Sequence, residues 1–165
     1  CAVILDAAAL AGRPELWAPE EAARRWLNAL SLVRPGHPSL VVGRIPDALG
    51  QMLVRWSPTD YAQRLLDERK ALGFFPACTM VALDGPPAQV RQVADQVVRE
   101  GGAQLVGTVA VPASHEGEEH QVRTLVRTSL PDTAAMLATL TDIRRSRSAR
   151  KAPLVKMSVN PPELF

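Results

Sequence analysis

The chain has 165 residues, enough for one ordinary domain or for one small domain with an appendage. With 47% hydrophobic and 22% charged residues it has the composition of a folded globular protein, which excludes wholesale disorder, and its net charge of +2 does not by itself indicate a polyanionic partner. No apolar run approaches 18 residues, so the sequence predicts no membrane span.

The first part of the chain has the order strand, helix, strand. Residues 1–6 form an apolar run of strand length, of the kind that is buried on both faces of a parallel sheet. Residues 18–33 are predicted to form a helix with Pro19 in its first turn, and residues 39–45 form a second strand. One such unit is too small to stand alone, and the chain has no initiator methionine, so we expect a piece of a larger α/β domain.

Residues 47–73 are predicted to be helical in two pieces, because Ser57 and Pro58 interrupt the helical pattern. The second piece ends at Gly73, a residue type that suits the position just after a helix. We therefore interpret residues 58–76 as a helix that connects the first part of the chain to the next.

The rest of the chain, residues 77–165, has the order βαββαβ. Its strands are predicted at 77–85, 103–113, 120–130 and 154–159, and its helices at 87–102 and 131–148. This order is that of a ferredoxin-like sandwich of two helices on a four-stranded sheet, in which the last strand usually lies beside the first. The inward face of the first helix is predicted to carry Val90, Val93, Ala94, Val97 and Val98. The fold class predicted for the whole chain is thus α+β.

Candidate catalytic and metal-binding motifs are weak. The sequence contains neither GxxxxGK[ST] nor GxGxxG, and no serine or cysteine stands in a recognised nucleophile motif. His115 and His120 flank an acidic loop, which fits either a metal site or a solvated hairpin tip; the lack of a third nearby ligand favours the hairpin tip. Cys1 and Cys78 lack the spacing of a zinc site and are expected to be free thiols in a reducing compartment, the cytoplasm.

A run of cations near the end of the chain is the strongest candidate binding feature. On a continuous helix, Arg144, Arg147 and Lys151 would form one cationic ridge. Such a ridge suits phosphate contact, although cations in a last helical turn also complement the helix dipole without any ligand. The strands carry no aromatic residue, which disfavours RNA recognition by base stacking. The candidate site residues are Arg144, Arg145, Arg147, Arg150, Lys151 and Lys156.

Three stretches resemble one family. LLDERKALGFFPA (65–77) resembles the segment that enters the C-terminal domain of the replication-restart helicase family PriA, also called primosomal protein N′. LVGTVAVPA (105–113) is similar to that domain's strand and turn VLGPVPAP, and PLVKMSVNPPEL (153–164) resembles its closing VxVDPPEL. Residues 4–36 are similar in outline to the end of the family's second helicase lobe.

The resemblance implies three parts. Residues 1–57 would be the remnant of helicase lobe 2, residues 58–76 a connecting helix, and residues 77–165 the C-terminal domain, which in this family resembles ribosomal protein S-ten. It also implies a role in primosome assembly at stalled or branched forks. The expected partners are branched or single-stranded DNA, single-strand DNA-binding protein and other primosome proteins, and the family's ATP and zinc sites would lie upstream of residue 1, so no cofactor is expected here.

The sequence departs from the family pattern at four places, one of which is Phe75-Pro76, where the family has Pro-Pro. NALSLVRPG (28–36) replaces an arginine-rich GRAGR motif, which implies a helicase-degenerate, actinobacterial member and no enzymatic activity for this chain. Asn160 replaces the aspartate of VDPPEL. The family's basic hairpin becomes the acidic SHEGEEHQVR (114–123), which would repel phosphates and leaves the cationic run as the main positive feature.

Three functions remain open at this point. The cationic run could contact the phosphates of DNA, or it could dock an acidic protein tail such as that of single-strand DNA-binding protein. A third possibility is a ferredoxin-like regulatory domain that binds a small metabolite, but the glycine-rich ligand loop that would support it is missing.

Overall fold

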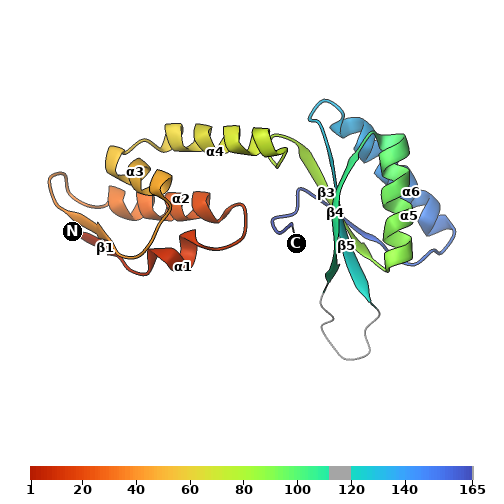
Figure 1. Ribbon diagram of the computed structural model, residues 1–165, viewed down its shortest axis with the longest axis horizontal. Helices are drawn as coiled ribbons and strands as arrows, with labels where there is room; N and C mark the ends of the chain where they lie inside the picture. Colours follow the sequence, from red (N-terminus) through yellow and green to blue (C-terminus); the bar gives the residue numbers. More distant parts are fainter. Residues whose placement is uncertain (112–119, 165) are drawn as a thin grey trace. The chain divides into compact units, whose positions relative to one another are not determined.

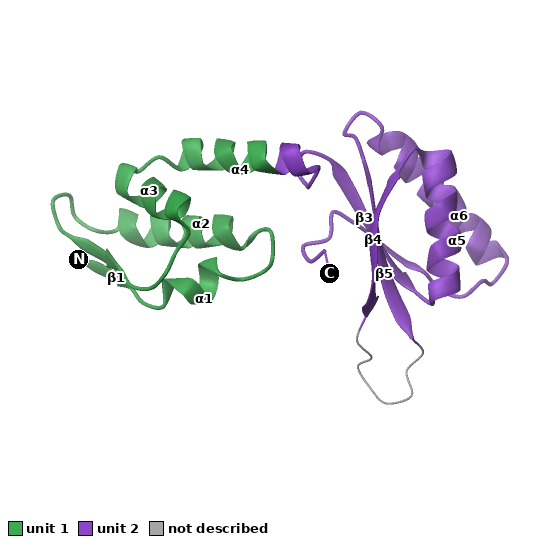
Figure 2. Cartoon of the chain, viewed as in Figure 1, with its two compact units in different colours: residues 1–68 green, residues 69–165 purple. Residues whose placement is uncertain are grey.

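A computed structural model describes residues 1–111 and 120–164 of the chain. The chain divides into two compact units, Cys1–Glu68 and Arg69–Phe165, and the division falls inside helix α4 (Pro58–Leu72) (Figure 2). Both helices and strands are present throughout, which confirms the α+β class (Figure 1).

The first unit contains a two-stranded parallel sheet and a small helical core. Strand β1 (Ala2–Ile4) pairs with β2 (Ser39–Val41). The buried core contains Trp26, Leu49 and Met52. The helices of this unit are α1 (Ala7–Ala11), α2 (Ala18–Ser31), α3 (Asp47–Arg55) and the part of α4 up to Glu68.

The expectation that residues 1–6 are buried on both faces is wrong. Ile4 and Val41 pack against the core of the first unit, whereas Val3 is 54% exposed and Leu40 is 57% exposed. Successive residues of a strand point to opposite faces, so the core covers one face of this sheet. Within the described residues no element of the first unit covers the other.

The second unit has the order βαββαβ. Its sheet has the strand order β4-β5-β3-β6, and all neighbouring strands are antiparallel. The last strand therefore lies beside the first strand of the unit, as expected from the sequence. The elements are β3 (Thr79–Gly85), α5 (Pro87–Gly101), β4 (Gln104–Val111), β5 (Gln121–Thr128), α6 (Thr133–Ala149) and β6 (Lys156–Val159).

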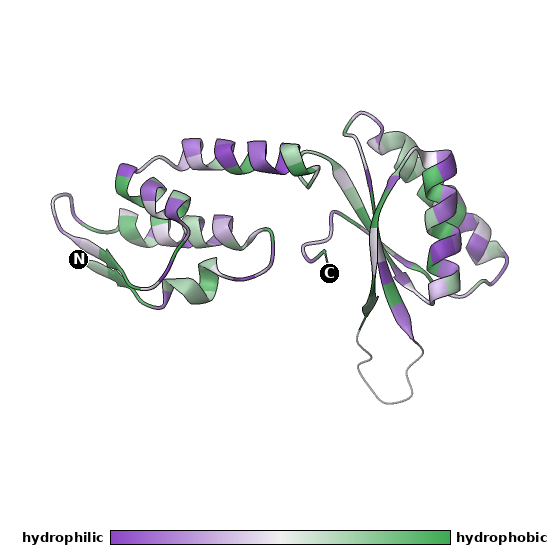
Figure 3. Cartoon of the chain, viewed as in Figure 1, coloured by the Kyte–Doolittle hydropathy of each residue, from purple (hydrophilic) through white to green (hydrophobic). Residues whose placement is uncertain are grey.

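Helices α5 and α6 cover one face of this sheet (Figure 1). Hydrophobic and hydrophilic residues alternate along α5, as in an amphipathic helix (Figure 3). Val97 is buried in the core between the helices and the sheet. The prediction for Val98 is wrong, because this side chain is 37% exposed. One residue corresponds to a rotation of about 100° around a helix, which turns Val98 to the edge of the buried stripe.

The C-terminal segment covers part of the other face. Asn160 has a left-handed backbone with φ of 46°, a conformation that asparagine tolerates better than most residues. Its N–H donates to the Met80 carbonyl at 2.8 Å, and its Oδ1 accepts from the Met80 N–H at 3.0 Å. The chain then turns across the sheet, where Leu164 and Phe74 pack on the buried side chains of Cys78, Met80, Ala82 and Leu125.

We expect Asn160→Ala to lower the free energy of unfolding by about 2 kcal/mol, because it leaves the Met80 N–H without its acceptor and forces alanine into a left-handed backbone. Asn160→Asp is the matched control, since a carboxylate oxygen accepts the same hydrogen bond and aspartate also tolerates this conformation. Chemical denaturation measures both variants; equal destabilisation of the two would contradict the role assigned to the side-chain oxygen.

Candidate binding groove at the end of helix α6

Helix α6 ends in a tight turn that is formed by two backbone hydrogen bonds. The N–H of Ala152 donates to the Arg147 carbonyl at 3.0 Å, and the N–H of Lys151 donates to the Ser148 carbonyl at 3.1 Å. This is a Schellman motif with Lys151 in the left-handed position, at φ of 51°. The expected ridge on a continuous helix is therefore wrong at Lys151, which lies beyond the helix end.

The turn nevertheless brings three of the predicted cations together around one groove of about 340 Å³. Arg144 and Lys151 are exposed and Arg147 is half-buried. Among the described residues that line the groove, no carboxylate accompanies these cations. The lining residues are Arg144, Arg147, Ser148, Lys151, Ala152, Pro153, Leu154, Val155 and Met157.

One wall of the groove is apolar. The segment between the helix end and β6 supplies Leu154, which is 84% exposed, and Val155, which is buried. Met157, the second residue of β6, packs against the core beneath. A single exposed apolar residue is common on protein surfaces and does not by itself mark a binding site. Here the exposed Leu154 lies beside positive charge, so the groove combines both features.

Arg147 has a structural task in the groove. Its Nη2 donates to Gln89 Oε1 on α5 at 2.8 Å and to the Pro153 carbonyl at 2.7 Å. These bonds join α5, α6 and the segment that leads into β6. The side chain of Arg144, by contrast, makes no hydrogen bond or ion pair within the described part of the chain, so its charge is available to a ligand.

The remaining predicted cations lie elsewhere. Arg150 lines an adjoining cleft between α5 and α6. Arg145 lies 3.6 Å from Asp142 in an exposed ion pair and does not line the groove. Lys156 is on β6 next to Met157, and because Met157 faces the helices, Lys156 points to the opposite face of the sheet. The structure therefore separates Lys156 from the others.

Two arginines of β5 were missed by the sequence reasoning. Arg123 binds Asp84 through two hydrogen bonds of 2.7 and 3.1 Å, and its Nη1 donates to the Glu163 carbonyl at 3.2 Å. The hydrogen bond to Asp84 raises the pKa of Arg123. The side chains of Arg123 and Asp84 are 23% and 18% exposed. Their ion pair joins β5 to β3, and the bond from Arg123 to the Glu163 carbonyl holds the C-terminal segment on the sheet.

Arg127 has a similar role at the other end of the strand. Its Nη1 donates to the carbonyls of Leu72 and Gly73 at 3.1 and 3.0 Å, where it complements the C-terminus of α4. Side chains alternate between the two faces of a strand, so the sequence of residues 121–127 predicts that Arg123 and Arg127 share one face of the sheet. Their partners, however, come from distant segments that this alternation does not reveal.

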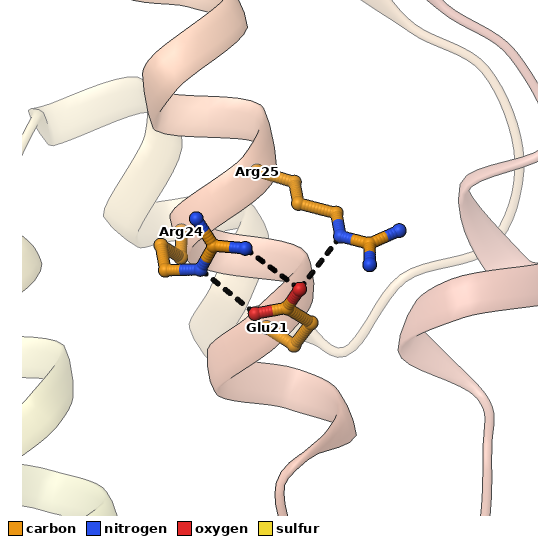
Figure 4. Close-up of polar contacts among 3 residues, drawn as sticks. All are labelled: Glu21, Arg24 and Arg25. Carbon is orange, nitrogen blue, oxygen red and sulfur yellow. Dashed lines mark hydrogen bonds and ion pairs between the residues drawn. The ribbon is translucent and has the colours of Figure 1, made fainter.

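The first unit has its own cluster of charges on α2 (Figure 4). Glu21 accepts two hydrogen bonds of 2.8 Å from Arg24 and one of 2.7 Å from Arg25. The bonds to Arg24, and then those to Arg25, lower the pKa of Glu21 from 4.5 to about 2. Both arginines are satisfied by the same carboxylate, so we do not assign this cluster to a binding site.

No group of three or more metal-ligating side chains comes together in the part of the chain that the structure describes. His120 is exposed, while His115 lies outside the described residues. Cys1 and Cys78 are free thiols, and burial raises the pKa of Cys78. None of the helices in residues 1–111 and 120–164 combines the length and the apolar character needed to cross a bilayer.

We expect Arg147→Ala to lower the free energy of unfolding by about 1–3 kcal/mol, because Gln89 and Pro153 both lose a charged donor. Arg144→Ala, one turn earlier on the same helix, should change it by less than about 0.5 kcal/mol. Urea denaturation of the two variants tests this difference, and similar midpoints would show that the bonds of Arg147 add no stability.

The lowered pKa of Glu21 predicts a pH dependence. Since the folded pKa of about 2 lies below the usual 4.5, the stabilisation is complete above pH 4.5 and is lost as the pH falls towards 2. A carboxyl titration followed by NMR should give a midpoint for Glu21 well below the usual 4.5. In Glu21→Gln this part of the acid sensitivity of folding should disappear; an unchanged acid profile would contradict the assignment.

Comparison with known proteins identifies the second unit. Residues 70–162 match the family model described as the primosomal protein N C-terminal domain. The chain is 35% identical over 114 residues to the probable replication restart protein PriA of Mycobacterium leprae (strain TN), which covers 67% of this chain and 18% of that protein. It is 30% identical over 179 aligned positions to the protein of the same name from Mycobacterium tuberculosis (strain CDC 1551 / Oshkosh), covering 97% of this chain and 27% of that protein.

The chain therefore spans between 18% and 27% of the length of these curated relatives. Among solved structures, one described as CPII bound to ADP and bicarbonate, from Thiomonas intermedia K12, is similar with a TM-score of 0.31 and 12% identity. That similarity covers 50% of this chain and 82% of that one, and it is too low to bear on the function. The family match and the two PriA relatives agree with the resemblance of the three sequence stretches, and the chain belongs to the primosomal protein N (PriA) family.

Proposed function

We propose that this chain is the partner-docking and DNA-contacting part of a replication-restart protein that acts in the cytoplasm at stalled or branched forks. In this proposal residues 1–57 are the end of the second helicase lobe and residues 77–165 form the docking domain. Residues 58–76 are the helix that connects these two parts. We assign the chain no catalytic step and no cofactor. The family membership and the position of the groove within the matched residues 70–162 support this proposal.

The groove at the end of α6 fits an acidic protein segment best. The observation that carries this conclusion is the combination of three cations with exposed Leu154 in one groove. A peptide that has carboxylates next to apolar side chains complements both features, as does the tail of single-strand DNA-binding protein in our proposal. A DNA backbone offers phosphates, but its sugars present less apolar surface to Leu154 than an apolar side chain does.

DNA contact is the second candidate, and it is favoured by the exposed cations around the helix end. Arg144 and Arg145 are exposed on the last turns of α6, and Arg150, the exposed C-cap residue, follows the helix. Phosphate contact depends on the summed charge of such a surface and falls steeply with salt. It would therefore use Arg145 as well as Arg144, whereas docking in the groove would not.

This difference defines the experiment. We expect Arg144→Glu to weaken binding of a peptide such as Asp-Asp-Asp-Leu-Phe by at least about tenfold, because it reverses a charge that lines the groove. Arg145→Glu is the matched control on the neighbouring position, and it should change the affinity by less than about threefold. Fluorescence anisotropy with a labelled peptide measures both.

A third variant separates binding from folding. Lys151→Gly removes a groove charge but relieves the left-handed strain of a non-glycine residue, so it should weaken peptide binding while raising the stability of the chain.

Fork DNA is titrated in parallel over a salt series. Equal losses of DNA affinity in the two arginine variants, together with no measurable peptide binding, would favour DNA and overturn the docking proposal.

A further inference from the structure

A second cleft adjoins the groove. It lies between α5 and α6, has a volume of about 140 Å³, and shares Arg147 and Ala152 with the groove as lining residues. Because both hollows are lined by these two residues, they meet at the end of α6. The polar lining of the cleft beyond Arg147 consists of Gln89, Gln92, Gln96, Ser146 and Arg150.

Three glutamines follow the cleft along one side of α5. Gln89, Gln92 and Gln96 have the spacing i, i+3 and i+7, which places them on one face of a helix. Gln89 Oε1 accepts from Arg147, which leaves its NH₂ group available, and Gln96 Nε2 donates to Glu100, which leaves its oxygen available. Gln92 is exposed, and its side chain makes no hydrogen bond within the described part of the chain. The row therefore offers both donors and acceptors.

This chemistry matches a peptide main chain. Each peptide unit carries one N–H donor and one C=O acceptor, and a glutamine amide can satisfy both. The charged residues that line the cleft and the groove are Arg144, Arg147, Arg150 and Lys151, so the charges of the described lining are all positive. An acidic segment is thus electrostatically favoured in the groove and at the adjoining end of the cleft, whereas the Glu100 carboxylate lies beside Gln96 at the far end of the cleft.

We propose that the two hollows form one bipartite site, in which the groove takes the acidic, apolar end of a partner segment and the glutamine cleft binds the main chain that precedes it. The inference rests on the proposed docking function. Arg147 is the point where the two halves meet, and its bonds to Gln89 and Pro153 keep the path open by fixing α5 against the segment that leads into β6.

The test compares two peptides on the full chain. The short probe is Asp-Asp-Asp-Leu-Phe with a free carboxylate, and the long probe carries six further residues, Ala-Ser repeated three times, before it. The long probe should bind at least about fivefold tighter than the short one. Gln92→Ala should remove this advantage and leave the affinity for the short probe unchanged. Gln51→Ala, an exposed glutamine on α3, is the matched control and should change neither.

The outcomes separate the two proposals. If the short probe binds and responds to Arg144→Glu, but the extension adds nothing or Gln92→Ala has no effect on it, the bipartite site is wrong and the docking function stands. If neither probe binds while fork DNA does, both proposals are overturned. A gain from the extension that disappears equally in Gln51→Ala would also overturn the assignment to this cleft.

Discussion

Strand β3 imposes the constraint on which the second unit depends. It is paired along both edges, with β5 on one side and β6 on the other, and six of its seven residues are buried. The edge of β3 that faces away from β5 needs a hydrogen-bonded partner strand. The chain supplies this partner as β6, so it must turn back towards β3 directly after α6. The helix therefore ends abruptly, in a turn that satisfies its last carbonyls and reverses the chain within a few residues.

The candidate groove is a consequence of this return. The Schellman turn places Lys151 next to the last helical turn, and the segment of Pro153 and Leu154 that follows forms the apolar wall. Arg147 joins this segment to α5 and α6. The two roles that the sequence left open fall to different residues in our proposal: Arg147 stabilises the turn, while Arg144, whose side chain has no partner in the described part of the chain, is assigned to the ligand.

The closing motif around Asn160 covers part of the face of the sheet that α5 and α6 leave open. The left-handed turn at Asn160 sends the last residues across that face, and Leu164 covers Met80 and Leu125 there. The ion pair of Arg123 with Asp84 holds the same segment through the Glu163 carbonyl. Position 160 requires a side chain that accepts the hydrogen bond from the Met80 N–H and a residue that tolerates a positive φ. Both asparagine and aspartate meet these two requirements.

The sequence by itself determined the elements whose signals are local. The buried stripe of Val90, Val93 and Val97 on α5, the order βαββαβ and the pairing of the last strand with β3 could all be predicted, because hydrophobic period and element order depend on neighbouring residues. Only the tertiary structure decided the position of each cation. Lys156 lies on the face opposite Met157, and Lys151 leaves the helix, because strand alternation and the helix end act on them separately. The partners of Arg147, Arg123 and Arg127 come from segments up to 58 residues away, which no local pattern encodes.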